Sequence, residues 1–404
     1  MFTFYGFASL IFVGVYTEGI TARDPEILMN CSQLIGYWEY PMEEHRVVTE
    51  DGYILKIYRI PHGHSRNVMY DFTPKPVVFI QHGLLSSCAD WISNLRNESL
   101  AFVFADAGFD VWLGNFRGNT YGREHIRLNT TSHEFWQFSW DQMAEYDLPA
   151  MVNMALNVSG AEHLYYIGHS EGAMTVFAKL SNDQEFAKKL KLVFALGPVT
   201  TVAHIKGVLS FLAKLTPQIA KITELFGIDE FLPDNKFVDF MKELFCKKHV
   251  AVELCKNILF LIAGPDSHQL NTTRVPVYIS HTSAGTSVRN IVHFAQLARN
   301  GHYEMYDYGS AAKNIFYYGQ ATPPVYDVRN ITVPVSLFWG AEDWLADPQD
   351  VVDGLLSKLK TVTSHFLKGF NHLDFLWGLR ATKMVYDVIR DEIYKDLVID
   401  NLKS

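Results

Sequence analysis

The stretch Tyr165-Tyr166-Ile167-Gly168-His169-Ser170-Glu171-Gly172 is an apolar run that breaks into the pattern Gly-X-Ser-X-Gly and continues with helical spacing through Lys179. The pattern alone is weak, because Gly and Ser are common residues. Between a strand and a helix it is typical of a nucleophile elbow, a sharp turn in which two glycines let the backbones approach each other. We therefore expect Ser170 to be a nucleophile above a β-sheet, with the helix dipole behind it.

Two later stretches supply the partners that such a serine needs. Asp343 follows the strand-like segment 334–340, and His372 follows the strand-like segment 364–367. A carboxylate at the end of a strand can orient an imidazole, which then removes the serine proton. The chain order Ser, Asp, His is that of α/β-hydrolases and differs from that of chymotrypsin or subtilisin. Three other carboxylates are alternatives to Asp343 as the orienting acid: Glu342, Asp347 and Asp374.

The segment 77–85 is a buried strand that opens into a His-Gly turn. The backbone N–H of Leu84 in this turn is expected to pair with that of Glu171 as an oxyanion hole, which stabilises the negative charge of a tetrahedral intermediate. His82 and His169 flank the two turns, and we expect both to be structural.

Together these motifs resemble the acid lipases, the family of gastric lipase and lysosomal acid lipase, from about Asp24 to the C-terminal helix. They are Asp24-Pro25-Glu26, Val48-Thr49-Glu50-Asp51-Gly52-Tyr53-Ile54-Leu55, Gln81-His82-Gly83-Leu84-Leu85, Asn115-Phe116-Arg117-Gly118-Asn119-Thr120, Ser283-Ala284-Gly285-Thr286-Ser287, Leu345-Ala346-Asp347-Pro348-Gln349-Asp350-Val351 and Asn371-His372-Leu373-Asp374-Phe375. The resemblance implies a triad of Ser170, Asp343 and His372, with Leu84 and Glu171 as oxyanion donors. The family usually has Gln where Glu171 stands, and a third cysteine at Ala263.

Composition narrows the classes of partner. The 404 residues are 48% hydrophobic and 20% charged, which is enough for a sizeable core and argues against disorder. A net charge of -9 without a Lys/Arg run disfavours nucleic acid or an anionic membrane as the main partner. No Cys/His/Asp cluster has metal-ligand spacing and no phosphate loop is present, so we predict no metal and no cofactor.

The N-terminus predicts entry into the secretory pathway. Residues 1–16 are almost wholly apolar, and we expect 1–22 to be a signal peptide; a buried N-terminal helix or an uncleaved anchor is the alternative. No other segment is long and apolar enough to span a membrane. Six asparagines begin an Asn-X-Ser/Thr sequon and are glycosylation candidates: Asn30, Asn97, Asn129, Asn157, Asn271 and Asn330.

Four cysteines become interpretable in that oxidising compartment. Cys246 and Cys255 match the paired cysteines of the acid lipases, so the resemblance implies a disulfide between them. The bridge must span a helix-turn-helix corner, because nine residues along one straight helix would separate the sulfurs too far. Cys31 and Cys88 have no obvious partner, and we expect them to be free, buried thiols.

The remaining chain predicts a core interrupted by a cap. Alternating apolar and polar residues on both sides of Glu50-Asp51-Gly52 indicate an antiparallel hairpin. In the separate segment 115–120, we expect Arg117 to have a structural role in the turn. After Pro198 the strand-like apolar runs end, and the apolar residues that follow have the spacing of helices. We predict core segments at 23–199 and 309–404 and a helical cap at 200–308, whose excess of apolar residues fits an acyl pocket. An ordinary second helical layer is the alternative.

These features predict an α/β-hydrolase fold with a mostly parallel central sheet and a helical cap. We expect hydrolysis of long-chain fatty acid esters, either triacylglycerols, sterol esters or both, at a lipid–water interface, in the lysosome lumen or outside the cell. The alternatives are a non-catalytic lipid-binding homologue and an esterase or acyltransferase that uses the same serine. Glu171 adds a hypothesis: a partly buried carboxyl beside the oxyanion would favour activity at acidic pH, unless it faces solvent or a basic partner.

Overall fold

The computed structural model describes residues 24–64, 74–207, 263–265 and 267–402, together with positions 210, 213, 227 and 229–231. The predicted signal peptide, 1–22, lies outside the described residues, and so do Cys246 and Cys255. The disulfide between those two cysteines therefore stays a prediction.

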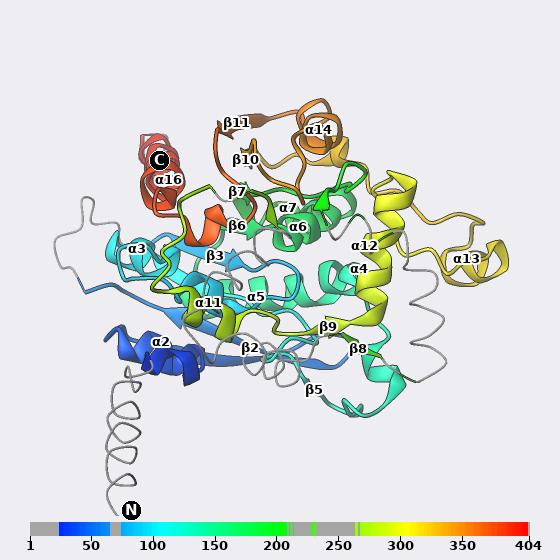
Figure 1. The fold of residues 1–404 in the computed structure, drawn as a ribbon, viewed down its shortest axis with the longest axis horizontal. Helices are drawn as coiled ribbons and strands as arrows, with labels where there is room; N and C mark the ends of the chain where they lie inside the picture. The colour runs from blue at the N-terminus through cyan, green and yellow to red at the C-terminus, as the bar shows by residue number, and fades with distance from the viewer. Residues whose placement is uncertain are drawn as a thin grey trace, which may run out of the picture.

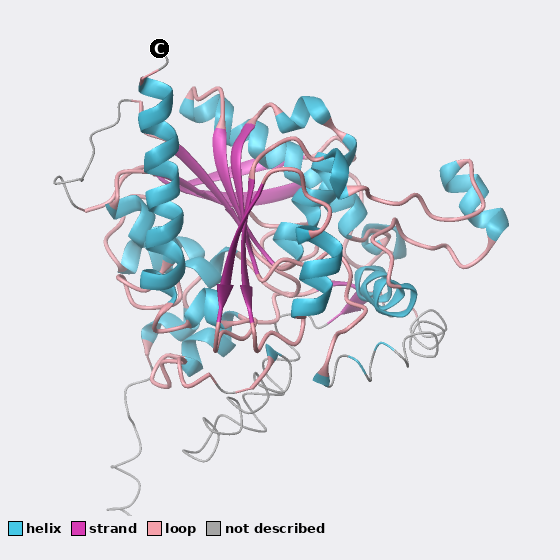
Figure 2. Ribbon diagram, turned by 90° about the horizontal axis from the view of Figure 1, so that it is seen from above, coloured by secondary structure: helices cyan, strands magenta, loops and turns pink. Residues whose placement is uncertain are grey.

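A twisted, mostly parallel β-sheet runs through the molecule, as Figure 2 shows from above. Its described strands follow the order β1-β2-β4-β3-β6-β7-β10-β11, and β5 pairs with β2. Only the pairs that involve β1 and β2 are antiparallel, so the predicted hairpin forms the antiparallel edge. The strands are β1 Glu43–Val48, β2 Tyr53–Ile60, β3 Val77–Gln81, β4 Asp110–Leu113, β5 Glu124–His125, β6 Leu164–His169, β7 Leu190–Leu196, β10 Val335–Gly340 and β11 Val362–Leu367. The predicted α/β-hydrolase fold is confirmed.

Helices cover both faces of this sheet (Figure 1). The described α-helices are α2 Cys31–Tyr37, α3 Leu100–Asp106, α4 Trp140–Gln142, α5 Leu148–Ser159, α6 Glu171–Asn182, α7 Gln184–Ala187, α11 Val275–His281, α12 Val288–Asn300, α13 Ala311–Tyr318, α14 Pro348–Val351, α15 Asp374–Trp377 and α16 Asp387–Asn401. Shorter turns are the 3-10 segments Pro25–Leu28, Cys88–Trp91, His133–Trp136 and Val328–Asn330 and the π turns Met143–Asp147, Val352–Leu356 and Thr382–Tyr386.

Alternate side chains of the central strands enter two separate cores. Phe79 and Tyr166 belong to the core shared with α5 and α6, whereas Ile80 and Ile167 belong to the core shared with α3 and α16. Strands buried on both faces need continuous apolar runs, which is what the sequence of 77–80 showed. The helices on both faces hold the parallel strands so that their carboxyl ends meet at one edge, where ligands bind in open α/β sheets.

The insertion between β7 and β10 contributes α11, α12 and a two-stranded sheet of β8, Glu230–Phe231, and β9, Thr286–Ser287. This strand pair was not predicted, because strands of two residues carry no periodic signal. Helix α12 is fixed to the core: the backbone N–H of Trp140 donates to Asn290 Oδ1 at 2.8 Å, and the Trp140 ring stacks on His293 with the ring centres 4.2 Å apart. The boundaries of the predicted helical cap, residues 200 and 308, remain a prediction.

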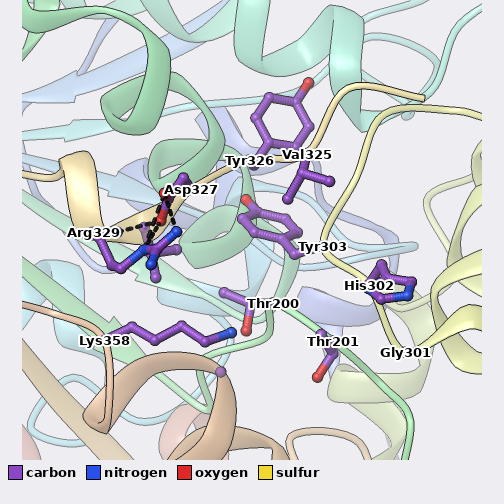
Figure 3. Close-up of a pocket in the computed structure, with 12 residues that line it drawn as sticks. Thr200, Thr201, Gly301, His302, Tyr303, Val325, Tyr326, Asp327, Arg329 and Lys358 are labelled. Atoms are coloured by element: carbon purple, nitrogen blue, oxygen red, sulfur yellow. Dashed lines mark hydrogen bonds and ion pairs between the residues drawn. The ribbon is translucent and has the colours of Figure 1, made fainter. Parts of the chain in front are cut away.

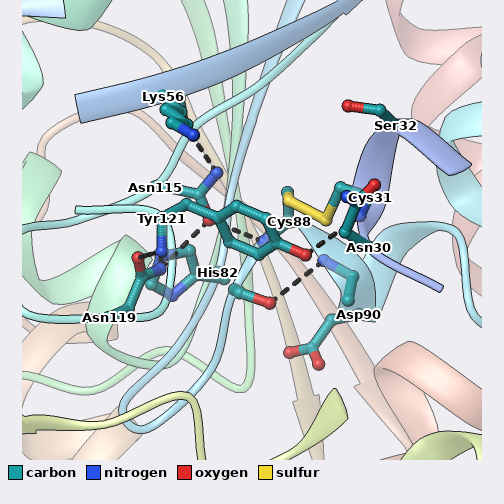
Figure 4. Close-up of a disulfide and its surroundings, with 12 residues drawn as sticks. Asn30, Cys31, Ser32, Lys56, His82, Cys88, Asp90, Asn115, Asn119 and Tyr121 are labelled. Carbon is teal, nitrogen blue, oxygen red and sulfur yellow. Dashed lines mark hydrogen bonds between the residues drawn. A yellow bond between two sulfur atoms is a disulfide. The ribbon is translucent and has the colours of Figure 1, made fainter. Parts of the chain in front are cut away.

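The structure contradicts the expectation of free thiols, because Cys31 and Cys88 form a disulfide (Figure 4). The bridge joins the first residue of α2 to the 3-10 turn that follows the β3 loop, and the Cα atoms are 6.7 Å apart. Neighbouring hydrogen bonds fix both residues: the Cys31 N–H donates to Tyr121 Oη and the Cys88 N–H to Asn115 Oδ1, each at 2.9 Å. The pairing is a contact across 57 residues, which no local pattern reveals.

We expect the double substitution Cys31→Ser and Cys88→Ser to lower the free energy of unfolding by about 4 kcal/mol. The chain-entropy model assigns this value to a closed loop of 57 residues, because the bridge restricts the unfolded chain. Urea unfolding of both proteins measures the difference. An unchanged midpoint, or alkylation of both thiols in the non-reduced protein, would contradict the assignment.

Arg117 lies fully buried between two carboxylates, which agrees with its predicted structural role. Its Nη1 and Nη2 donate to Asp51 at 2.5 and 2.8 Å, and its Nε donates to Asp147 Oδ1 at 2.8 Å. The guanidinium carbon lies 3.9 Å from the centre of the Tyr53 ring. These contacts join the β1–β2 turn, the loop after β4 and the turn before α5.

We expect Arg117→Lys to destabilise the fold by about 3 kcal/mol, because one ammonium group cannot hold two carboxylates in the planar fork geometry. The matched control is Arg329→Lys, since Arg329 pairs with Asp327 while its side chain is 69% exposed, and exposed pairs contribute little to stability. Urea unfolding should separate the two variants. Equal losses of unfolding free energy in the two variants would show that the buried Arg117 cluster stabilises the fold no more than an exposed ion pair does.

Candidate active site

Ser170 occupies the sharp turn that was predicted between β6 and α6. Its backbone has φ +53° and ψ −113°, a conformation that residues with a Cβ rarely adopt. The flanking glycines are required by close approach: a Cβ on Gly168 would lie 2.7 Å from the Gly172 carbonyl, and one on Gly172 would lie 2.6 Å from the Gln81 oxygen. Strand β6, helix α6 and the end of β3 therefore approach one another so closely beside Ser170 that positions 168 and 172 have no room for a side chain.

Asp343 and His372 are brought together at the ends of neighbouring strands β10 and β11. His372 Nδ1 lies 2.8 Å from Asp343 Oδ2, and both residues are buried. Asp343 Oδ1 accepts the backbone N–H groups of Leu345 and Ala346 at 2.9 and 2.8 Å, which fixes the carboxylate plane. With its hydrogen on Nδ1 the ring donates to Asp343, and Nε2 is then the nitrogen that can accept a proton.

The alternative acids are engaged elsewhere or point outward. Glu342 is exposed. Asp347 accepts the Gln349 N–H at the start of α14 and pairs with Lys206. Asp374 accepts the Asn371 N–H and the Ser267 hydroxyl at 2.7 and 2.8 Å. Asp343 is the carboxylate that contacts the imidazole.

The turn after β3 lies against the elbow. A Cβ on Gly83 would lie 3.0 Å from Ser170 Cβ and 3.1 Å from His169 Nδ1, so the turn needs glycine to approach so closely. Leu84 follows directly and is partly exposed. His82 anchors the turn: its Nδ1 lies 2.8 Å from the Gly83 oxygen, and its Nε2 accepts the Phe116 N–H at 3.1 Å. Burial lowers the pKa of His82 to about 4, so the ring stays neutral.

Two further residues support His372. His169 Nε2 lies 2.9 Å from the His372 carbonyl oxygen, and the two rings are 4.6 Å apart. Burial holds the pKa of His169 well below its ordinary value, so the neutral ring donates this hydrogen bond. The carbonyl of Ala263 accepts the N–H groups of His372 and Trp344 at 3.3 and 3.2 Å. Sequence reasoning gave His169 a structural role without a partner and missed the contacts of Ala263, which comes from the insertion.

The comparisons with known proteins agree with the fold. Residues 76–379 match the family profile described as alpha/beta hydrolase fold, and residues 31–95 match the one described as partial alpha/beta-hydrolase lipase region. Human lysosomal acid lipase/cholesteryl ester hydrolase is 45% identical over 385 residues, covering 94% of this chain and 95% of the human one. The chain belongs to the acid lipase family of α/β-hydrolases.

Other relatives of this lipase have the same full-length match. Lipase lipl-1 of Caenorhabditis elegans is 49% identical, covering 93% of this chain and 94% of the other. Human gastric triacylglycerol lipase is 44% identical, covering 96% and 98%. Among solved structures, the esterase RhEst1 from Rhodococcus sp. has a TM-score of 0.50 at 14% identity, covering 87% of this chain and 98% of the other, which shows the fold alone. This lipase is a carboxylic ester hydrolase.

A separate cavity of about 510 Å³ opens where the ends of the insertion meet the core (Figure 3). Its lining includes Thr200, His302, Tyr303 and Lys358, and no residue of the predicted triad. Within the described residues, no group of three or more His, Cys, Asp or Glu side chains could hold a metal ion. The same part of the chain has no helix with the length and apolar character that crossing a bilayer requires.

Proposed function

We propose that this lipase hydrolyses long-chain fatty acid esters with Ser170 as nucleophile, His372 as base and Asp343 as orienting acid. The observation that carries the proposal is the 2.8 Å contact between His372 Nδ1 and Asp343 Oδ2. His169, the residue before Ser170, contacts both the ring and the backbone of His372, which supports a base close to the nucleophile.

The proposed reaction has two halves. Nε2 of His372 takes the Ser170 hydroxyl proton while Oγ bonds to the ester carbonyl carbon, and the carbonyl electrons move onto oxygen. The N–H groups of Leu84 and Glu171 would donate to this oxyanion. The oxyanion collapses, the ester C–O bond breaks, and the alcohol leaves with the proton from His372. Water, activated by His372, then attacks the acyl-enzyme and releases the fatty acid.

The substrate class rests on the relatives and on the insertion. One relative bears the name cholesteryl ester hydrolase and another triacylglycerol lipase, which supports neutral esters of long-chain acids as substrates. The apolar excess of the predicted cap fits an acyl pocket better than a site for short esters. A non-catalytic lipid-binding role would not require the Asp343–His372 pair, and this pair disfavours it.

A secretory route to the lysosome lumen or the cell exterior is part of the proposal. Two observations support it: the Cys31–Cys88 disulfide, which is typical of oxidising compartments, and the position of the six sequons. Asn271 is partly exposed, and the other five asparagines are exposed: Asn30, Asn97, Asn129, Asn157 and Asn330.

Hydrolysis of triolein, cholesteryl oleate and a short-chain ester, compared between pH 4 and 8, tests the substrate class. We expect the long-chain esters to be turned over with higher kcat/KM than the short one, because an acyl pocket adds binding energy with each buried methylene. Preference for the short ester would indicate an esterase, and hydrolysis of none of the three would indicate the lipid-binding alternative.

A further inference from the structure

The side chain of Glu171 turns from the elbow to the insertion. Glu171 is the first residue of α6 and is 2% exposed. Its Oε1 accepts the side-chain amide of Asn290 at 2.7 Å, across 119 residues of sequence. Asn290 lies in the first turn of α12. The residue after the nucleophile is thus tied directly to a helix of the insertion.

Asn290 cannot rotate away from this contact without losing others. Its Oδ1 accepts the backbone N–H of Trp140 at 2.8 Å, and its own backbone N–H donates to Ser287 Oγ at 2.9 Å. Its amide nitrogen also donates to Thr286 Oγ1 at 3.2 Å. The amide group is therefore held as a donor towards Glu171, and this orientation follows from the Trp140 contact.

Charged groups on the surrounding elements are committed to other partners. On α12, Arg289 donates to the Gln137 carbonyl and His293 contacts the Glu304 carbonyl. On α4, Asp141 accepts the Tyr326 hydroxyl at 2.8 Å, and in the turn that follows it Glu145 and Asp147 face Lys179 and Arg117. At the elbow, His169 contacts the His372 carbonyl and His372 pairs with Asp343.

Glu171 is therefore a buried carboxyl group whose partner is a neutral amide, and no ion pair joins it to a cation among the described residues. Burial raises the pKa of Glu171 to about 7, against the opposing effect of the Asn290 hydrogen bond. Below that pH the group is neutral, and above it the group carries a charge close to the N–H that the proposed function places in the oxyanion hole.

We propose that Glu171 is a positioning residue: its neutral carboxyl group holds helix α12 against the nucleophile elbow and keeps the adjoining oxyanion donor free of a competing negative charge. The inference rests on the proposed function, because it concerns the same oxyanion. An ionised carboxylate would repel the charge that develops in the transition state, whereas the neutral group does not. Ester hydrolysis by this chain is thereby favoured at acidic pH, and the cause is Glu171, which stands where the acid lipases usually have Gln.

The test is the pH profile of kcat/KM for the wild type and Glu171→Gln, measured between pH 4 and 8 on one soluble p-nitrophenyl ester. Gln has the same shape and keeps the acceptor oxygen for Asn290, but it does not ionise. The ratio of Glu171→Gln to wild-type activity should rise through pH 7, by roughly tenfold or less. The control is Glu185→Gln, because the Glu185 side chain is 82% exposed and pairs with Lys188 at the surface; its profile should match that of the wild type.

Asn290→Asp gives a second, independent measurement. The new carboxyl keeps an acceptor for the Trp140 N–H but replaces the donor that faces Glu171. When one of two facing carboxyl groups ionises, the other, still protonated, donates a hydrogen bond to it. The pair therefore first becomes charged at a lower pH than Glu171 alone, and activity should fall at lower pH than in the wild type. Adding Glu171→Gln should return the profile towards that of the wild type, because one buried carboxyl group facing one amide is left.

Superimposable wild-type and Glu171→Gln profiles, or an Asn290→Asp profile identical to that of the wild type, would overturn the inference. Failure of the proposed function has a different signature, since neither the wild type nor any variant would then hydrolyse the ester.

Discussion

Ser170→Ala is expected to reduce ester hydrolysis by roughly 10⁴- to 10⁶-fold while leaving the fold intact, because residues of a triad act as a unit. The substitution deletes only the nucleophilic oxygen. Alanine keeps the Cβ, so the cost of the backbone at φ +53° is the same in both proteins. The close contacts of Gly168 and Gly172 are untouched. Turnover of triolein and the thermal unfolding midpoint measure the two effects separately.

The control for this substitution is Ser181→Ala, on helix α6, which follows the turn. Ser181 is also buried, but its hydroxyl only donates to the Ala178 carbonyl at 2.9 Å, so activity should remain at the wild-type level. Retention of wild-type turnover by Ser170→Ala would refute the nucleophile. A loss of activity accompanied by unfolding would point to the turn instead of the hydroxyl.

Asp343→Asn should lower kcat by roughly 10⁴-fold, the effect of placing the imidazole in the wrong tautomer. Asp343 Oδ1 receives the N–H groups of Leu345 and Ala346, so the carbonyl oxygen of an asparagine would occupy that position. The amide NH₂ would then face His372 Nδ1 and force the hydrogen onto Nε2, where it blocks proton removal from Ser170. The measurement is kcat on a soluble ester under saturating conditions.

Asp347→Asn is the matched comparison, because Asp347 was an alternative acid. Asparagine caps helices about as well as aspartate, so α14 should persist and kcat should change little. If Asp347→Asn lost activity and Asp343→Asn kept it, the acid would be misassigned in spite of the 2.8 Å contact.

The elbow and the hairpin could be predicted because their signals are local. Gly168 and Gly172 mark close approach within five residues, and the turn at Glu50-Asp51-Gly52 lies between two alternating strands. Asp343 and His372 could be paired because parallel neighbouring strands present their carboxyl ends at one edge.

The parts that were missed depend on contacts between distant segments. The Cys31–Cys88 bridge has no local pattern, although an even cysteine count with one pair already assigned was a usable signal. The surroundings of Glu171 also required the fold: the side chain is buried against an amide, and faces neither solvent nor a base. Nothing in the sequence around Asn290 indicates that contact.

The segment 263–264 has a consequence for engineering chimeric enzymes. Ala263 receives the N–H groups of His372 and Trp344, and a Cβ on Gly264 would lie 2.0 Å from the Glu342 oxygen. This part of the insertion, which precedes α11 and α12, thus packs against the loops that carry Asp343 and His372. A graft that exchanges the whole insertion between family members would therefore replace residues that hold the Asp343 and His372 loops, so Ala263 and Gly264 of the recipient chain should be kept.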